Sequence, residues 1–258
     1  MSGPPIVARL SAHALEAIPE IRPGDDLAEV IVTALAGAGP DAGQLVAIAH
    51  TAVSKAEGAL VDLAGVDPGE RARALAADNG ADPRMIEVVL GESAEVLRAE
   101  RGVLISRTRH GLVCANAGVD ASNSGDPDTV VLLPRDPDGS ARRIRARLRE
   151  LLGGDGPAVL ISDTFGRAWR VGQTDVAIGL AGMQPLDDWR GRSDAAGLQL
   201  RATWLAVADA AAGAADLVRA KDSGQPIVIL DGLERFITPE DGPGAGAIVR
   251  PAAEDLFR

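Results

Sequence analysis

Short apolar runs alternate along the chain with segments whose apolar residues recur at helical spacing. Apolar runs of about four to eight residues are typical of buried strands, and a one-sided apolar stripe is typical of a helix packed against them. Strands are predicted over residues 45–49, 103–106, 129–133, 158–162 and 226–230. Helices are predicted over residues 27–35, 84–90, 140–152 and 199–218. This alternation predicts a mixed α/β (α+β) fold.

The length of 258 residues accommodates one large domain or two intimate subdomains. Residues 1–238 carry the alternating pattern and are predicted to form that domain. Residues 239–258 open with the turn-forming sequence PEDGPGAG and are predicted to be a C-terminal extension or linker.

Composition narrows the classes of partner. The net charge of −11 argues against a nucleic-acid or anionic membrane surface. No apolar stretch approaches the roughly 20 residues that a membrane-spanning helix needs, so no membrane association is expected. A single cysteine, Cys114, excludes an internal disulfide and predicts a reducing, cytoplasmic location.

Only two of the 26 basic residues are lysines, Lys55 and Lys221. Lys55 lies in HTAVSKAEG, residues 50–58, directly after the predicted strand 45–49. A lysine just past a strand end can reach into a cleft as a point charge, which suits phosphate. An ordinary strand-to-helix turn capped by Ser54 is an equally good interpretation of this segment alone.

A second segment, residues 111–124, is rich in small residues and ends in Asp120, Ser122 and Asn123. Small residues let the backbone approach a ligand, and a carboxylate beside an amide is a reasonable site for a hard cation. The alternative is a turn, since Asp, Ser, Asn and Gly favour turns for local reasons.

The third segment, residues 159–179, runs from a buried strand directly into Asp163 and Thr164. An Asp beside a hydroxyl at the carboxyl end of a strand is well placed for Mg²⁺ or Mn²⁺. Arg167 and Arg170 follow and are candidates for gripping phosphate or carboxylate. The alternative is structural pairing of these arginines with Asp163 or Asp175. The chain has no P-loop, HExxH or GxSxG motif, and three scattered histidines do not predict a zinc site.

Taken together, these segments resemble the coenzyme F420-0:L-glutamate ligase (F420 gamma-glutamyl ligase) family. The resemblance rests on IPEIRPGDDLAE, VSKAEG, ADPRMIEVVL, GLVCANAGVDASN, DPDGSARRIR, ISDTFGRAWRVGQTDVAIGLAG and PIVIL, in that order. The ending GPGAGAIVRPAAEDLFR resembles the junction to a second domain. The resemblance therefore implies either the N-terminal ligase domain of the bifunctional actinobacterial form or a single-domain member.

The resemblance implies an acid–amino-acid ligase of coenzyme F420 biosynthesis that forms an amide. GTP phosphorylates the terminal carboxylate of coenzyme F420-0, and L-glutamate attacks the acyl phosphate; a further γ-linked glutamate can be added to F420-1. It also implies Mg²⁺ or Mn²⁺, K⁺, and an intertwined homodimer. Two alternatives stay open: a non-catalytic nucleotide- or coenzyme-binding module for a reductase domain, and a metal-dependent phosphohydrolase.

The resemblance also implies site residues. Asp120 and Asp163 would ligate the first metal, and Thr164 the second. The GTP site would contain the following residues: Ile18, Pro19, Glu20, Ile21, His50, Lys55, Asn123, Arg219, Ala220, Lys221, Asp222, Ser223, Gly224, Gln225 and Pro226. Lys55, Arg167 and Arg170 are the catalytic candidates. The resemblance does not assign the two arginines or Gln173; their residue types predict that they bind the coenzyme phosphodiester or the incoming glutamate.

Two positions depart from the family pattern. Ala17 stands where the family often has Gly, and Lys221 stands where some members carry a Gln-like ligand of the second metal. Because a protonated lysine cannot ligate a cation, Lys221 is expected either to disturb the second metal site or to take over part of its charge.

Overall fold

The computed structural model describes residues 9–37, 39–122 and 125–255. Its centre is a five-stranded sheet in the order β1-β12-β2-β8-β9. Strands β2 and β8 are parallel, and the other neighbours are antiparallel. The strands are β1 (Ser11–Ala14), β2 (Leu45–Ala49), β8 (Ala158–Arg167), β9 (Arg170–Ala181) and β12 (Ile227–Asp231).

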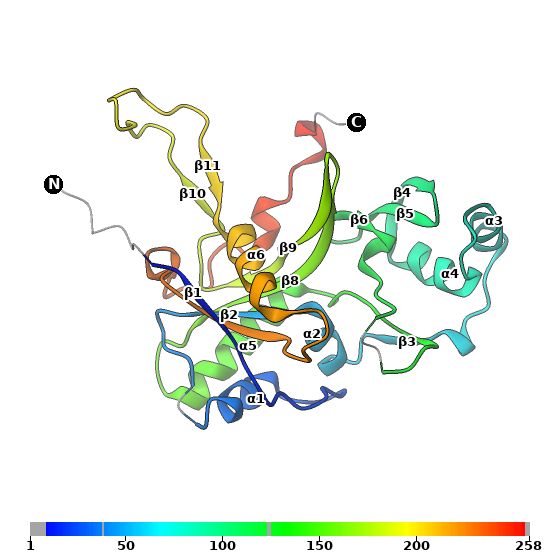
Figure 1. Cartoon of the computed structure of the whole chain (residues 1–258), viewed down its shortest axis with the longest axis horizontal. Coiled ribbons are helices and arrows are strands. Elements are labelled where there is room, and N and C mark those ends of the chain that lie inside the picture. The colour runs from blue at the N-terminus through cyan, green and yellow to red at the C-terminus, as the bar shows by residue number, and fades with distance from the viewer. Residues whose placement is uncertain (1–8, 38, 123–124, 256–258) are drawn as a thin grey trace.

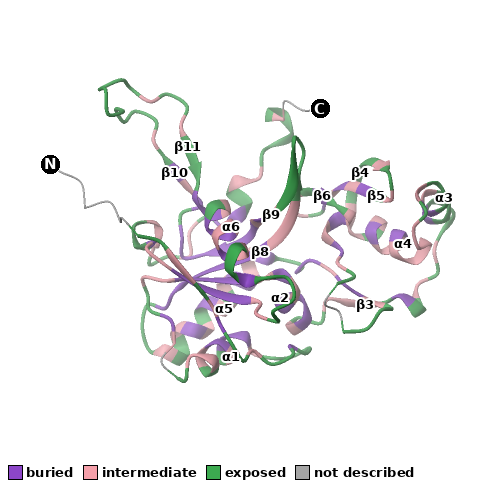
Figure 2. Ribbon diagram, in the orientation of Figure 1, coloured by how far each residue is buried: buried purple, intermediate pink, exposed green. Residues whose placement is uncertain are grey.

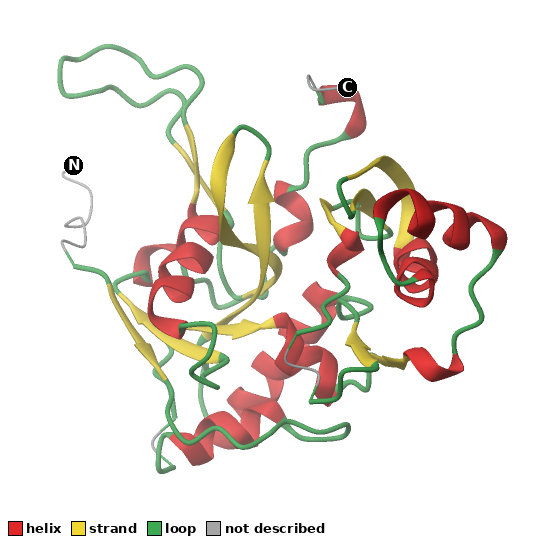
Figure 3. Cartoon of the chain, turned by 45° about the vertical axis from the view of Figure 1, so that its right-hand side comes forward, coloured by secondary structure: helices red, strands yellow, loops and turns green. Residues whose placement is uncertain are grey.

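Helices cover both faces of this sheet, which makes three layers (Figures 1 and 3). Helices α1 (Leu27–Ala34) and α5 (Pro137–Leu152) pack on one face, and α6 (Val207–Arg219) packs on the other. Strand β2 shows why both faces are apolar. Val46 and Ile48 enter the core with α1 and α5, whereas Leu45 and Ala47 enter the core with α6.

A smaller lobe lies beside the central sheet and has its own core (Figure 1, right). Its core includes Ala72, Val89 and Leu104, and it fits the two intimate subdomains that the length allows. The lobe consists of α3 (Glu70–Asn79), α4 (Pro83–Glu92), β4 (Ser93–Glu100), β5 (Val103–Thr108) and β6 (Val113–Ala115), with β3 (Leu60–Asp62) paired to β7 (Thr129–Val131).

A two-stranded arm, β10 (Leu186–Asp188) with β11 (Trp204–Ala206), projects from the body, and Figure 2 shows that most of it is exposed. Arginines lie over two of its aromatic rings, Arg190 at 4.1 Å from the centroid of Trp204 and Arg192 at 4.9 Å from that of Trp189. Short 3₁₀ helices cover Leu63–Gly65, Asn116–Gly118, Glu234–Phe236, Ala245–Ile248 and Ala252–Glu254.

The mixed α/β class and the strand 45–49 are confirmed, and the other predicted strands and helices are found with shifted ends. The predicted helix 199–218 is wrong in its first half, because residues 204–206 form β11 and backbone hydrogen bonds such as Leu200 N–H to Arg192 O hold the arm. Strand β9 was not predicted. Ser54 does not cap a helix: α2 (His50–Ala56) begins directly after β2, and Ser54 is buried inside it.

Residues 239–246, predicted as extension or linker, pack against the domain. The buried guanidinium of Arg145 donates to Asp241 at 2.8 Å, and the Asp138 carboxylate accepts from the backbone N–H groups of Ala245 and Gly246. Ala245 is buried in the core on the α6 side. The boundary at residue 238 stays a prediction, while the segment that follows it is held by specific contacts.

Within the described residues, no helix combines the length and apolarity needed to cross a bilayer.

Candidate functional site

A cavity of about 870 Å³ opens where the parallel pairing of β2 with β8 ends, at Ala49 and Ser162. Carboxyl ends of neighbouring parallel strands are where α/β sheets bind ligands. The lobe and the turn that follows it contribute Cys114, Ala115, Asn116, Gly118, Val119, Asp120, Ser122 and Gly125 to its wall, and the residues after α6 contribute another side. The described charged residues that line it are Glu20, Lys55, Asp120, Asp163, Asp175, Arg219 and Lys221. Four carboxylates thus face three basic groups, a net charge of −1.

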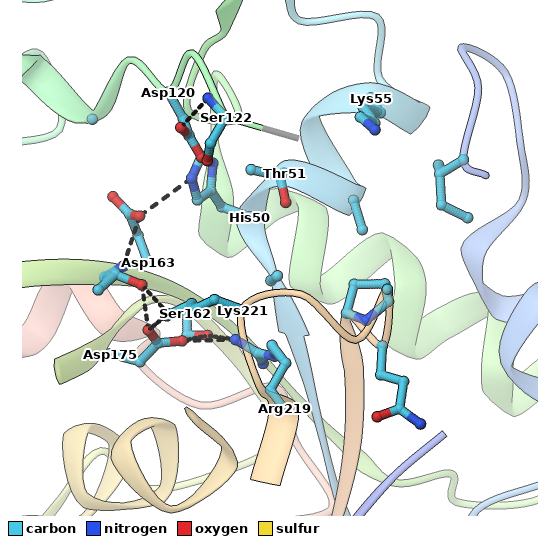
Figure 4. A pocket seen from close by; sticks show the side chains of 18 of the residues that line it. His50, Thr51, Lys55, Asp120, Ser122, Ser162, Asp163, Asp175, Arg219 and Lys221 are labelled. Carbon is cyan, nitrogen blue, oxygen red and sulfur yellow. Dashed lines mark hydrogen bonds and ion pairs between the residues drawn. The ribbon is translucent and has the colours of Figure 1, made fainter. Parts of the chain in front are cut away.

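His50 directly follows β2, and Asp163 lies on β8, one residue beyond the end of its parallel pairing with β2 (Figure 4). His50 is buried, and its Nε2 lies 3.2 Å from Asp163 Oδ1. The same carboxylate oxygen accepts from the backbone N–H of Thr164 at 2.7 Å. His50 therefore holds Asp163 in place, as histidines commonly do with carboxylates beside a metal.

Asp120 projects from the lobe side of the cavity. Its Oδ1 accepts from the backbone N–H of Ser122 at 2.7 Å. The turn that leads to Asp120 contains Asn116 and Ala117 at φ of 50° and 52°, a left-handed conformation that is uncommon for residues with a Cβ. The backbone of Asp120 pairs with Val131, its side chain begins the turn to Ser122, and it lines the cavity.

Asp175 is the most deeply buried carboxylate of the site, with a side chain that is 1% exposed. It accepts from the hydroxyls of Ser162 and Thr164, both at 2.7 Å, and from the Arg219 guanidinium at 2.7 Å. Burial raises the pKa of Asp175, but these hydrogen bonds and the charges of Arg219 and Lys221 outweigh burial and hold that pKa below its ordinary value. Burial lowers the pKa of Arg219, and Asp175 opposes that shift.

The two lysines both line the cavity but lie in different surroundings. Lys55 is nearly buried on α2, and its Nζ is 2.5 Å from Glu20 Oε1. Lys221 is more exposed; its Nζ donates to Thr164 Oγ1 at 2.7 Å and to Asp216 Oδ1 at 2.8 Å. Figure 4 shows Lys55 apart from the cluster around Asp175 and Lys221.

The donor set decides which cation fits. Mg²⁺ is commonly held by one or two carboxylates and completes its coordination with water and substrate phosphate. Asp120 and Asp163 meet that need, since both line one cavity and no basic side chain of the described residues other than His50 pairs with either. Groups of three or more His, Cys, Asp or Glu placed to hold a metal do not occur in the described ranges.

The cavity brings together most of the predicted site residues. It is lined by Ile18, Pro19, Glu20, Ile21, His50, Lys55, Asp120, Asp163, Thr164, Gln173, Arg219, Ala220, Lys221, Gly224, Gln225 and Pro226. Asp222 and Ser223 belong to the same segment without lining the cavity, and Asn123 falls outside the described residues.

Arg167 and Arg170 lie beyond the cavity, at the exposed tip of the β8–β9 hairpin. Arg167 donates to the carbonyl of Val171 at 2.6 Å, within the hairpin turn. The structural alternative that paired these arginines with Asp163 or Asp175 is wrong, because Asp175 pairs with Arg219 instead.

Sequence reasoning missed Ser162 and Asp175 as site residues. The register of β8 and β9 places Thr164 directly opposite Asp175. The available signal was a lone Asp just before the apolar run VAIGLA of a strand, where a buried charge demands a partner. Cys114 also lines the cavity, where burial and the negative charge of Asp163 raise the pKa of its thiol to about 12.

Ala17 takes φ of +56°, a conformation that glycine adopts without the steric cost of a Cβ. The departure from the family's Gly at this position therefore falls on a residue whose backbone favours Gly. Ala220, between Arg219 and Lys221, is a second such residue, at φ of +47° and ψ of 140°.

The sheet topology and the charged cavity at its strand ends define an α/β protein built to bind a small, charged ligand. The chain belongs to the F420-0:Gamma-glutamyl ligase family, whose profile matches residues 16–232.

Three relatives, each named coenzyme F420:L-glutamate ligase, are similar over nearly their whole lengths. The Methanopyrus kandleri protein is 47% identical over 241 residues, 93% of this chain and 94% of that protein. The Methanothermobacter thermautotrophicus protein is 43% identical over 252 residues, 96% and 99% of the two chains. The Haloarcula marismortui protein is 38% identical over 256 residues, 96% of each. These three relatives match the single-domain form of the family, since the unmatched remainder of each is too short for a second domain.

Proposed function

We propose that this chain ligates L-glutamate to coenzyme F420-0 in a GTP-dependent reaction of coenzyme F420 biosynthesis. The observation that carries the proposal is the cavity itself. Asp120 and Asp163 lack a lysine or arginine partner among the described residues, while Lys55, Arg219 and Lys221 line the same space. The charged residues that line this site have a net charge of −1, and a nucleoside triphosphate is itself negatively charged. Such a site therefore accepts the nucleotide only together with a cation. The family and the names of the relatives supply the acceptor and the amine.

The reaction proceeds in two balanced steps. The terminal phosphoryl group of GTP passes to the carboxylate of the coenzyme, which leaves GDP and forms an acyl phosphate. The amine of L-glutamate then attacks the acyl carbon and loses a proton, and phosphate departs as the amide forms. A second round on F420-1 would use the γ-carboxylate of the glutamate already added.

Each residue has a defined task in this scheme. Asp120 and Asp163 would hold Mg²⁺ or Mn²⁺, which when bound neutralises phosphate charge and polarises the transferred group. His50 positions Asp163. Lys55 binds a phosphate oxygen after exchanging its ion pair with Glu20, which lines the same cavity. K⁺, which the resemblance also implies, stays a prediction.

Arg167 and Arg170 are proposed to bind the part of the coenzyme that extends out of the cavity. With a rise of about 3.3 Å per residue, the strand carries Arg167 roughly 10 Å beyond Thr164. Gln173 lines the cavity on the facing strand, between this tip and Asp175. A ligand whose carboxylate lies beside Asp163 would therefore place a phosphodiester farther out, along the hairpin.

The homodimer is proposed on the exposed apolar side chains of the arm and the hairpin. Leu198 is 69% exposed, Trp204 49% and Val171 95%. Large apolar side chains gathered on projecting elements are typical of association surfaces. Light scattering coupled to size-exclusion chromatography measures the molar mass in solution and tests this proposal. The molar mass of a single chain at micromolar concentration would contradict it. The cytoplasmic location stays a prediction.

One assay tests the ligase proposal. The protein is incubated with GTP, Mn²⁺, F420-0 and L-glutamate, and the coenzyme is examined by mass spectrometry while GDP is quantified. The expected result is a coenzyme heavier by one or more glutamyl residues, with GDP formed in step. GDP formed equally without glutamate would indicate a phosphohydrolase, and GTP binding without turnover would indicate a non-catalytic module.

A further inference from the structure

The oxygens available to a second cation are already held by basic side chains of this chain. Thr164 Oγ1 donates its hydrogen to Asp175 Oδ1 at 2.7 Å, so it is a lone pair of that oxygen that accepts from Lys221 Nζ, also at 2.7 Å. Asp175 Oδ2 accepts from Ser162 and Arg219. The Lys221 ammonium itself lies 3.6 Å from Asp175 Oδ1. Both oxygens of the carboxylate are therefore engaged.

A divalent ion does not fit this arrangement. It would share Thr164 Oγ1 with an ammonium that cannot act as a ligand, close to the second positive charge of Arg219. The predicted second metal site, which the family resemblance centres on Thr164, thus disagrees with the residues present. The first site, at Asp120 and Asp163, has no such competitor among the described side chains.

We propose that the ammonium of Lys221 is a resident cation that replaces the second cation of this site and binds the nucleotide phosphate directly. An ammonium has three N–H donors. Two of them are directed to Thr164 and Asp216, which leaves one for an anionic oxygen in the cavity that Lys221 lines. Lys221 is then a catalytic residue that touches the substrate, and one divalent cation per chain is enough.

The proposal accounts for the way the segment around Lys221 is fixed. Arg219 is buried against Asp175, and Ser223 donates to the carbonyl of Arg219, so the backbone on both sides of Lys221 is held. Asp216, one turn earlier in α6, orients the ammonium. A surface lysine with only a solubility role would not need three partners from three different elements.

This inference rests on the proposed nucleotide site, and counting bound Mn²⁺ tests it without any turnover. The protein is titrated with Mn²⁺ in the presence of one equivalent of GDP, and free Mn²⁺ is followed by electron paramagnetic resonance. We expect one tightly bound Mn²⁺ per chain in the unchanged protein and two in Lys221→Gln. Lys221→Arg should keep one, because the positive charge stays. Two Mn²⁺ in the unchanged protein, or an equal number in Lys221→Gln, would overturn the proposal.

Two further variants control the count. Arg201→Gln removes one exposed positive charge on the arm and should leave a single Mn²⁺ site. Lys221→Met removes the charge without offering a ligand oxygen; it should bind a second Mn²⁺ at least tenfold more weakly than Lys221→Gln. An equal affinity of Lys221→Met and Lys221→Gln for the second Mn²⁺ would show that only the loss of the positive charge matters. It would overturn the expectation that a ligand oxygen at position 221 holds the second cation together with Thr164 Oγ1. Thermal melting verifies that each variant is folded.

The ligase assay separates this inference from the proposed function. Glutamyl product together with the same number of bound Mn²⁺ in all Lys221 variants would support the ligase function and contradict the role of Lys221 as a resident cation. A changed number of bound Mn²⁺ without glutamyl product would support the resident cation and contradict the ligase function.

Discussion

Asp163 and Asp175 lie on adjacent strands of the same sheet, line the same cavity and have opposite surroundings. Asp175 is buried under two hydroxyls, a guanidinium and an ammonium. Asp163 is 13% exposed and is contacted by His50 and one backbone N–H. On the Asp175 side of the cavity, Arg219 and Lys221 balance the carboxylate. On the Asp163 side, carboxylate oxygens are available to a ligand that enters the cavity.

The difference shows how one site can hold negative charge for two purposes. A fully buried carboxylate is tolerated only where partners inside the protein compensate it, so Asp175 is part of the architecture. A carboxylate at a cavity wall, fixed by an imidazole and a backbone N–H, keeps oxygens for an external cation. Substitutions that remove one element of this contrast at a time separate the two roles.

The largest effect is expected from Asp175→Asn. Removing one partner of a buried ion pair leaves Arg219 uncompensated, which costs about 3–5 kcal/mol of the free energy of unfolding. Urea denaturation followed by circular dichroism measures it. The double variant Asp175→Asn with Arg219→Met should recover part of the loss, because the buried charge is gone.

The lowered pKa of Asp175 fixes the pH range of this effect. A carboxylate whose pKa is lower in the folded chain stabilises the fold fully above its ordinary value of 3.8, and that contribution is lost as the pH falls through the lowered pKa. The difference in unfolding free energy between the unchanged chain and Asp175→Asn should therefore be constant from pH 5 to 8 and shrink below about pH 4. A difference that shrinks already at pH 6 would show that another group is responsible.

Asp163→Asn breaks the other side of the contrast and should act on turnover rather than on the fold. Loss of one carboxylate ligand should reduce glutamyl transfer roughly 100- to 1,000-fold, equivalent to about 3–4 kcal/mol of transition-state stabilisation. The rate of glutamyl product formation and the urea midpoint are measured together. Asp78→Asn, on the exposed face of α3, is the matched control and should change neither. If Asp163→Asn is destabilised but still active, Asp163 has a structural role and is not a metal ligand.

The sequence predicted the Asp163 side of this contrast better than the Asp175 side, for a physical reason. The buried strands 45–49 and 158–162 are short apolar runs, and the residues that follow two adjacent parallel strands must meet at one edge of the sheet. His50, Asp163 and Thr164 were therefore predicted as the polar residues that follow the two runs, whereas the parallel pairing that brings them together was not predicted. The pairing of Lys55 with Glu20 was not, since only the family resemblance placed residues 18–21 near α2.

The surroundings of Asp175 were not predicted because strand β9 was not predicted. Its first half, RVGQTD, has no apolar alternation, because residues 170–173 are exposed near the tip of the hairpin and only Asp175 is buried. Without β9 there was no register to set Asp175 opposite Thr164, and none to show that the hairpin carries Arg167 and Arg170 past the cavity. Long-range register is decided by tertiary packing, which no local pattern encodes.

A smaller effect is expected from His50→Phe, which keeps the ring volume and removes the contact to Asp163. Loss of such an outer partner of a metal-binding carboxylate typically weakens metal affinity about 10- to 100-fold. The Mn²⁺ titration with GDP measures this change, with Phe chosen because it fills the same buried position. His110→Phe is the control, because the half-buried His110 ring contacts the carbonyl of Arg135 and does not line the cavity. Equal Mn²⁺ affinity in His50→Phe and the unchanged chain would remove the positioning role.

The smallest effect is expected from Ala220→Gly, and it bears on how the internal cations are kept in place. Ala220 holds φ of +47° and ψ of 140°, a region that residues with a Cβ rarely occupy. Glycine relieves that strain but is more flexible when unfolded, so a net stabilisation of about 1 kcal/mol or less is expected from urea denaturation. The same variant should weaken the binding of GDP a fewfold, because the hinge between Arg219 and Lys221 becomes freer. A gain in stability with unchanged GDP affinity would mean that Arg219 and Asp216 alone fix Lys221; a loss of stability would mean that the Ala220 conformation carries no strain.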